Sequence, residues 1–120
     1  MSLPDFSRSQ IGHYRNKREI IRLTAQQVIR DFALFGIEVT FSGDTLNAYD
    51  ELFEQLASCL TELLDTDYRK LLALLYHIDI SENELSKHMA HCTQDHPELI
   101  AGMILDRELK KVLIRKFYRG

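Results

Sequence analysis

The chain has 120 residues, of which 45% are hydrophobic and 28% are charged, and its formal net charge at pH 7 is −3. These values are typical of a folded globular domain and exclude a disordered chain. No apolar run approaches the roughly 20 residues that cross a bilayer, which excludes a membrane-spanning protein. We expect one helical domain over residues 1–120, with residues 1–10 loosely ordered.

The charges are sorted along the chain. Residues 38–98 hold thirteen Asp and Glu against three Lys and Arg, whereas the first 37 and the last 22 residues carry six Lys and Arg each. Such sorting indicates either helices that pack by complementary charge or a surface for an anionic partner. The sequence leaves both interpretations open.

The first predicted helix runs from Arg18 to Phe35, where apolar residues recur every three or four positions. Gly36 follows it, as expected of a left-handed C-terminal cap. Residues 37–41 then alternate apolar and polar side chains, several of them β-branched, which predicts a short strand or extended segment with one face buried. A lone strand has unpaired backbone groups, and an identical segment from a second copy is one partner for them.

The most regular helical pattern follows a turn in which Thr45 is the expected N-cap. Its apolar positions repeat at intervals of three and four residues: Leu46, Tyr49, Phe53, Leu56, Leu60 and Leu63. Leu52 and Leu64 widen this stripe, which favours packing inside a bundle over a two-stranded coiled coil.

A third helix is predicted from Tyr68 to about His77, with Asp65 and Asp67 as capping candidates before it. No Gly or Pro separates this helix from the preceding one, so the sequence leaves open whether the two form one kinked rod.

Ser81 and Glu84 form a capping-box pattern that predicts the start of a fourth helix. Leu85, Met89 and Cys92 are its expected core face. A fifth helix is predicted from Pro97 to about Tyr118. The fold class is therefore an all-α bundle of four to five antiparallel helices with one short extended segment near residues 37–41.

One cluster has the side chains of a metal site. Glu84, His88 and His91 fall on one face of the fourth predicted helix, and carboxylate and imidazole groups bind zinc and similar ions. A solvated helix face explains the same residues, because no further ligand pair stands at the spacing of structural zinc sites. The sequence contains no nucleophile elbow and no glycine-rich phosphate loop, so we predict no catalytic residue, no cofactor and no enzymatic activity.

A row of basic residues runs along the last predicted helix at intervals of four residues: Arg107, Lys111, Arg115 and Arg119. With a second group near the N-terminus, it could bind phosphates or an acidic protein surface: Arg15, Lys17, Arg18 and Arg22. The alternative is a solvated or internally paired face. Glu51, Glu54 and Glu62 are then the expected partners, and Glu108 lies three residues before Lys111 on the same helix.

The sequence therefore predicts a small, soluble, non-enzymatic interaction or regulatory protein that forms a homodimer. Its interface is expected at Ile37 to Phe41 or at the apolar stripe of the helix that follows. The first ten residues show no targeting pattern, and Cys59 and Cys92 have no disulfide-like spacing, so we expect a cytoplasmic protein with free thiols. The alternative is a weak, sequence-independent binder of nucleic acid or phosphorylated ligands, and a metal-dependent enzyme is the third.

Overall fold

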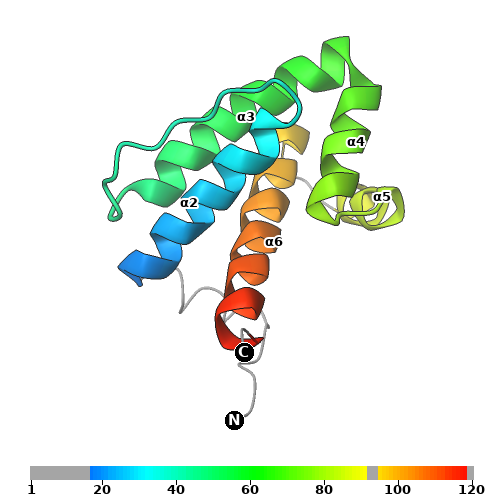
Figure 1. Ribbon diagram of the computed structural model, residues 1–120. Helices are drawn as coiled ribbons and strands as arrows, with labels where there is room; N and C mark the ends of the chain where they lie inside the picture. Colours follow the sequence, from blue (N-terminus) through cyan, green and yellow to red (C-terminus); the bar gives the residue numbers. More distant parts are fainter. Residues whose placement is uncertain (1–16, 92–94, 119–120) are drawn as a thin grey trace.

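The structure, a computed structural model, describes residues 17–91 and 95–118. Within these ranges the chain forms helices and no strand (Figure 1): α2 (Arg18–Ala33), α3 (Ala48–Thr66), α4 (Tyr68–Ile78), α5 (Glu82–Ala90) and α6 (His96–Tyr118). The predicted all-α bundle is confirmed. The expectations for residues 1–10, Arg15, Cys92 and Arg119 fall outside the described residues.

Helix α6 is the centre of the bundle, because it packs against α2, α3, α4 and α5. Its sequence explains this position, since apolar residues occur around most of its circumference and not along a single stripe. The buried apolar residues of α6 are Ile100, Ala101, Ile104, Leu105, Leu109, Val112 and Leu113. A buried polar group is costly unless it has a hydrogen-bonding or charged partner, and α6 places the carboxyl group of Glu108 inside the bundle.

The end of α2 confirms the predicted glycine cap. Gly36 has a positive φ of 74°, a conformation that glycine adopts without steric cost. Its N–H donates to the Ala33 carbonyl at 3.0 Å, and the N–H of Ile37 donates to the Phe32 carbonyl at 3.1 Å. These two bonds satisfy the last carbonyls of the helix and turn the chain back along the bundle.

Residues 37–41 are extended, but they form no β-ladder in the described structure. The predicted alternation holds, since Val39 is buried while Glu38 and Thr40 are exposed. The strand itself is wrong, because a side chain of α3 takes the place of a partner strand. The N–H of Thr40 donates to Gln55 Oε1 at 2.9 Å, and Gln55 Nε2 donates to the Thr40 carbonyl at 2.7 Å.

The same segment sets the direction of α3. Ser42 donates its N–H to Glu51 of α3 at 2.8 Å, one turn before the Gln55 contact, so the segment runs antiparallel to α3. Helices α2 and α3 therefore run in the same general direction (Figure 1), because the connection between them crosses the full length of the bundle. The antiparallel arrangement expected of neighbouring helices is therefore wrong for this pair, because that expectation assumed short connections, whereas residues 34–47 return along α3 before it begins.

The buried face of α3 differs from the predicted stripe at its start. Helix α3 begins after Asn47 instead of Thr45, and Leu46 is 89% exposed. The residues that enter the core are Leu52, Leu56, Leu60 and Leu63. Leu46 and Tyr49 are exposed although they belong to the predicted stripe, so the regular spacing continues beyond the core.

Asp67 separates α3 from α4, which settles the question of one kinked rod. Its backbone leaves the helical region, with φ −153° and ψ 74°, and its side chain accepts the Lys70 N–H at 3.1 Å. Ser81 caps α5 by accepting the Glu84 N–H at 3.0 Å. The capping role predicted for these two residues is confirmed, although the carboxylate of Glu84 turns to another partner.

Candidate functional site

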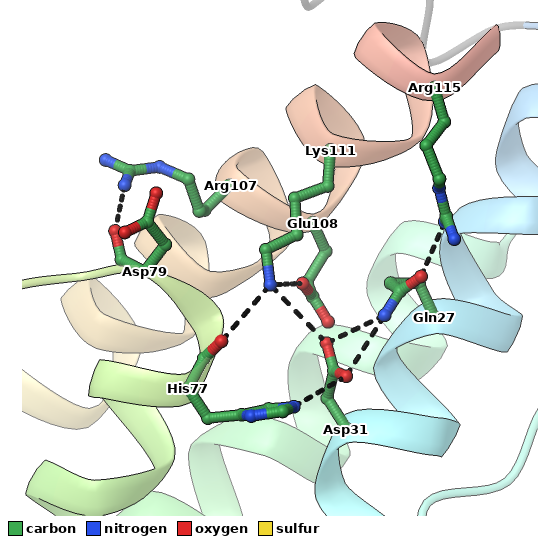
Figure 2. Close-up of polar contacts among 8 residues, drawn as sticks. All are labelled: Gln27, Asp31, His77, Asp79, Arg107, Glu108, Lys111 and Arg115. Carbon is green, nitrogen blue, oxygen red and sulfur yellow. Dashed lines mark hydrogen bonds and ion pairs between the residues drawn. The ribbon is translucent and has the colours of Figure 1, made fainter. Parts of the chain in front are cut away.

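Three helices meet at a group of polar side chains that we call the polar junction (Figure 2). It contains Gln27 and Asp31 from α2, His77 from α4, and Glu108, Lys111 and Arg115 from α6. The side chains of Asp31 and Glu108 are 6% and 0% exposed, whereas His77 and Lys111 lie at the solvent edge. The junction is thus a buried pair of carboxyl groups beneath two basic side chains.

The carboxylate of Asp31 is surrounded by hydrogen-bond donors and basic groups. Gln27 Nε2 donates to both carboxylate oxygens at 3.0 Å, His77 Nε2 lies 3.2 Å from Oδ1, and Lys111 Nζ lies 3.8 Å from Oδ2. Burial alone would raise the pKa of Asp31, but hydrogen bonds from Glu108 and Gln27 and the charge of Lys111 outweigh it and lower the pKa below 3.8. Asp31 is therefore the ionised member of the pair.

Glu108 has the opposite environment. Neither of its carboxyl oxygens accepts a hydrogen bond from the described residues, and the nearest cation, Lys111 Nζ, lies 3.5 Å from Oε1. Burial, followed by the hydrogen bond and negative charge of Asp31, raises the pKa of Glu108 to about 9. The side chain is consequently neutral at pH 7 and can itself act as a donor.

The structure shows where the basic row of α6 points. Arg107 donates to the Asp79 carbonyl and contacts Glu84 of α5 at 2.5 Å. Lys111 lies between the two buried carboxyl groups, and Arg115 donates to Gln27 Oε1 at 2.5 Å. These three side chains are paired within the chain.

Their partners differ from the acidic residues expected on the middle helices. The predicted contact from Lys111 to Glu108 is present, whereas Glu51 instead accepts hydrogen bonds from Ser42. The physical reason is position along the bundle, because α6 turns these cations toward α2, α4 and α5. Lys17, Arg18 and Arg22, the described members of the N-terminal basic group, are exposed.

The three metal-ligand candidates are not brought together. Glu84 faces Arg107, and Nδ1 of His88 lies 2.8 Å from the Glu84 carbonyl oxygen of its own helix. His91 lies at the end of α5. Within the described residues, no group of three or more His, Cys, Asp and Glu side chains is placed to hold a metal ion.

A pocket of about 400 Å³ opens on another side of α6, between the first turns of α2 and α3. Its walls are mostly apolar and are formed by Arg18, Ile21, Thr24, Thr45, Leu46, Ala48, Tyr49, Leu52, Leu105 and Leu109. Leu46, one of these lining residues, has 89% of its surface exposed. We call this region the pocket face; it combines an apolar cavity with an exposed apolar side chain and the cation Arg18.

Sequence reasoning missed Asp31, His77 and the burial of Glu108. A usable signal exists for Glu108, because Ile104 and Val112 stand four residues before and after it on the same helical face. A carboxylate within such an apolar stripe is a candidate buried acid. Asp31 has Val28 three residues before it and Phe35 four residues after it, but nothing in the sequence pairs the two acids, because they belong to helices far apart in the chain.

The arrangement restricts what chemistry the junction can perform. Glu108 has no exposed surface, so a substrate cannot reach this carboxyl group, whose pKa burial raises to about 9. In the described ranges, no helix combines the length and the apolar character needed to cross a membrane. No family model, no curated protein and no solved structure matches the chain.

Proposed function

We propose that this protein is a non-enzymatic interaction protein that associates with a second copy of itself through the pocket face. The observation that carries the proposal is the exposure of Leu46, 89%, beside an apolar pocket of about 400 Å³. An exposed leucine at an apolar pocket presents apolar surface to water in an isolated chain, and association removes this surface from water.

The pocket face is suited to a copy of itself. A two-fold interface brings the same patch together from both chains, so a protrusion and a cavity on one patch can fill each other. Leu46 supplies the protrusion, and the pocket beside it supplies the cavity. The charges are also complementary, because Arg18 stands on the α2 side and Asp44 precedes the lining residue Thr45 on the α3 side.

The two surfaces expected from the sequence contribute less. Val39 and most of the α3 stripe are buried in the bundle, and Gln55 already pairs with the backbone of Thr40. Leu46 and Tyr49 are the members of that stripe that stay exposed. The proposed dimer therefore uses the first turn of α3 and not residues 37–41.

Two other functions receive less support. Arg107, Lys111 and Arg115 are engaged inside the chain, which removes three of the basic residues expected to form a polyanion surface. Enzymatic activity would need a reachable acid, base or nucleophile, and the two carboxyl groups with shifted pKa values at the junction, Asp31 and Glu108, are buried.

The half-buried free thiol of Cys59 suits a reducing compartment, so we propose that the protein is cytoplasmic.

Sedimentation velocity over 1 to about 500 µM protein tests the proposal. We expect a species of twice 14.0 kDa at the upper end of this range. Leu46→Glu should weaken the dimer at least tenfold, because each chain loses about 1.5 to 3 kcal/mol of apolar burial and gains a charge at the interface.

Leu34→Glu is the matched control. Leu34 is also exposed, at 69%, but it follows the opposite end of α2 from Arg18, roughly 24 Å away for sixteen residues of helix. Its replacement should leave the dimer unchanged. A monomer throughout the concentration range, or equal weakening by both variants, contradicts the proposed interface.

A further inference from the structure

We propose that Asp31 and Glu108 hold one proton between them at neutral pH, and that this proton fastens α6 to α2 in the folded chain. Figure 2 shows the two carboxyl groups pointing toward each other at the centre of the polar junction. The proton forms an O–H bond on Glu108 and a hydrogen bond to the Asp31 carboxylate. Deprotonation releases it to solvent and leaves two negative charges in contact.

The first argument is the count of charges. Lys111 Nζ lies 3.5 Å from Glu108 Oε1 and 3.8 Å from Asp31 Oδ2, so one ammonium group serves two carboxyl groups. With both acids ionised, the buried group would carry one uncompensated negative charge. Such a charge is expensive away from water, and one bound proton removes it.

The second argument is the set of hydrogen bonds. Asp31 accepts from Gln27, and His77 Nε2 lies 3.2 Å from it, whereas Glu108 accepts from none of the described residues. A buried ionised carboxylate without donors is rare, but a buried carboxylic acid needs only an acceptor. The proton therefore resides on Glu108, and Asp31 is its acceptor.

Apart from Lys111, no basic side chain at the junction contacts Glu108 in the described structure. Helix α4 contributes His77, which lies beside Asp31, and α6 contributes Arg115, which is occupied with Gln27. Arg107, one turn before Lys111 on α6, is paired with Glu84 of α5. The buried residues of α3 that form the core are Ala48, Leu52, Leu56, Leu60 and Leu63, none of which is charged.

Infrared spectroscopy detects the proton directly. At pH 7.5 ordinary Asp and Glu side chains are ionised, so the carbonyl stretch of a carboxylic acid reports a protonated group. We expect this band in the wild-type protein, its loss in Glu108→Gln, and its retention in Glu98→Gln. Glu98 is an exposed residue of the same helix and provides a matched change of charge. Absence of the band from the folded wild-type protein, or its survival in Glu108→Gln, overturns the proposal.

Urea unfolding at several pH values tests the fastening role. The native chain keeps the Glu108 proton up to a pKa of about 9, whereas the unfolded chain releases it near 4.5. Between these values the native state binds more protons, so the unfolding constant should increase with pH by up to tenfold per unit. Glu108→Gln should lose this increase, and Glu98→Gln should keep it. The same slope in all three proteins refutes the fastening role, and the wild-type infrared titration decides the matter if Glu108→Gln does not fold.

Discussion

The two sides of α6 stabilise the bundle in different ways. On the pocket side, Leu105 belongs to the same apolar core cluster as Leu52 of α3. On the junction side, Glu108 and Lys111 meet Asp31 of α2, and the contact depends on donors, acceptors and one proton. Burial of apolar area has no preferred direction, whereas hydrogen bonds between buried groups require one arrangement.

This difference indicates separate roles for the two sides. The junction engages its charged groups inside the chain, so it fixes the position of α6 relative to α2 and α4. The pocket face leaves a cavity and an exposed leucine, so it has surface to offer to another chain. Three of the cations that the sequence offered as a binding surface, Arg107, Lys111 and Arg115, have partners inside the chain. The exposed apolar residues at the start of α3, Leu46 and Tyr49, are available for association.

The largest expected effect comes from the apolar interior of α3. Leu60 is fully buried, so Leu60→Ala should lower the free energy of unfolding by about 2 to 5 kcal/mol, through lost burial and the cavity that remains. The exposed Leu34 is the control, and Leu34→Ala should change stability by less than about 0.5 kcal/mol. Urea denaturation of both variants measures the difference. Similar values for the two would mean that α3 is not part of the core.

A smaller loss is expected when the junction loses its ionised acid. Asp31→Asn removes the charge that faces Lys111 and His77, and we expect it to cost about 1 to 3 kcal/mol at pH 6. Because the folded pKa of Asp31 is lowered, its contribution is present above 3.8 and is lost as the pH falls through the folded value. The gap between wild type and Asp31→Asn should therefore shrink as the pH falls below 3.8. A constant gap in that range contradicts this assignment of charge.

The smallest effect concerns the outer face of α3, away from both sides of α6. Gln55→Ala removes the three hydrogen bonds that join its side chain to Thr40, and we expect a cost of about 1 kcal/mol. Amide hydrogen exchange at Thr40 should become faster, while exchange in α3 itself should change little. If exchange at Thr40 is unaffected, the segment is held by Val39 and its apolar contacts alone.

Local signals predicted the helices well, because caps and apolar spacing act within a few residues. Gly36, Asp67 and Ser81 each end or begin a helix as their chemistry requires. The strand at residues 37–41 was wrong for a reason outside that range, since Gln55 lies fifteen positions further along the chain. The β-pattern identified an extended segment with one buried face, but it could not identify the partner.

The candidate sites were predictable only in part. The i,i+3 contact from Glu108 to Lys111 followed from helical spacing. Asp31 and His77 could not be joined to them, because the meeting of α2, α4 and α6 is a property of the packed bundle. Likewise, the regular spacing of the α3 stripe did not reveal that Leu46 lies beyond the reach of the core.

One variant tests most directly whether the basic row belongs to the fold or to a partner. Thermal unfolding should show Lys111→Gln/Arg115→Gln to be less stable than wild type by about 1 to 2 kcal/mol, because both side chains have partners inside the chain. Arg69→Gln/Lys87→Gln, which removes the same charge from two exposed positions, should be nearly neutral. If the Lys111 and Arg115 variant is as stable as wild type or more stable, these cations repel one another on the surface, and the division of α6 into a packing side and an association side is wrong.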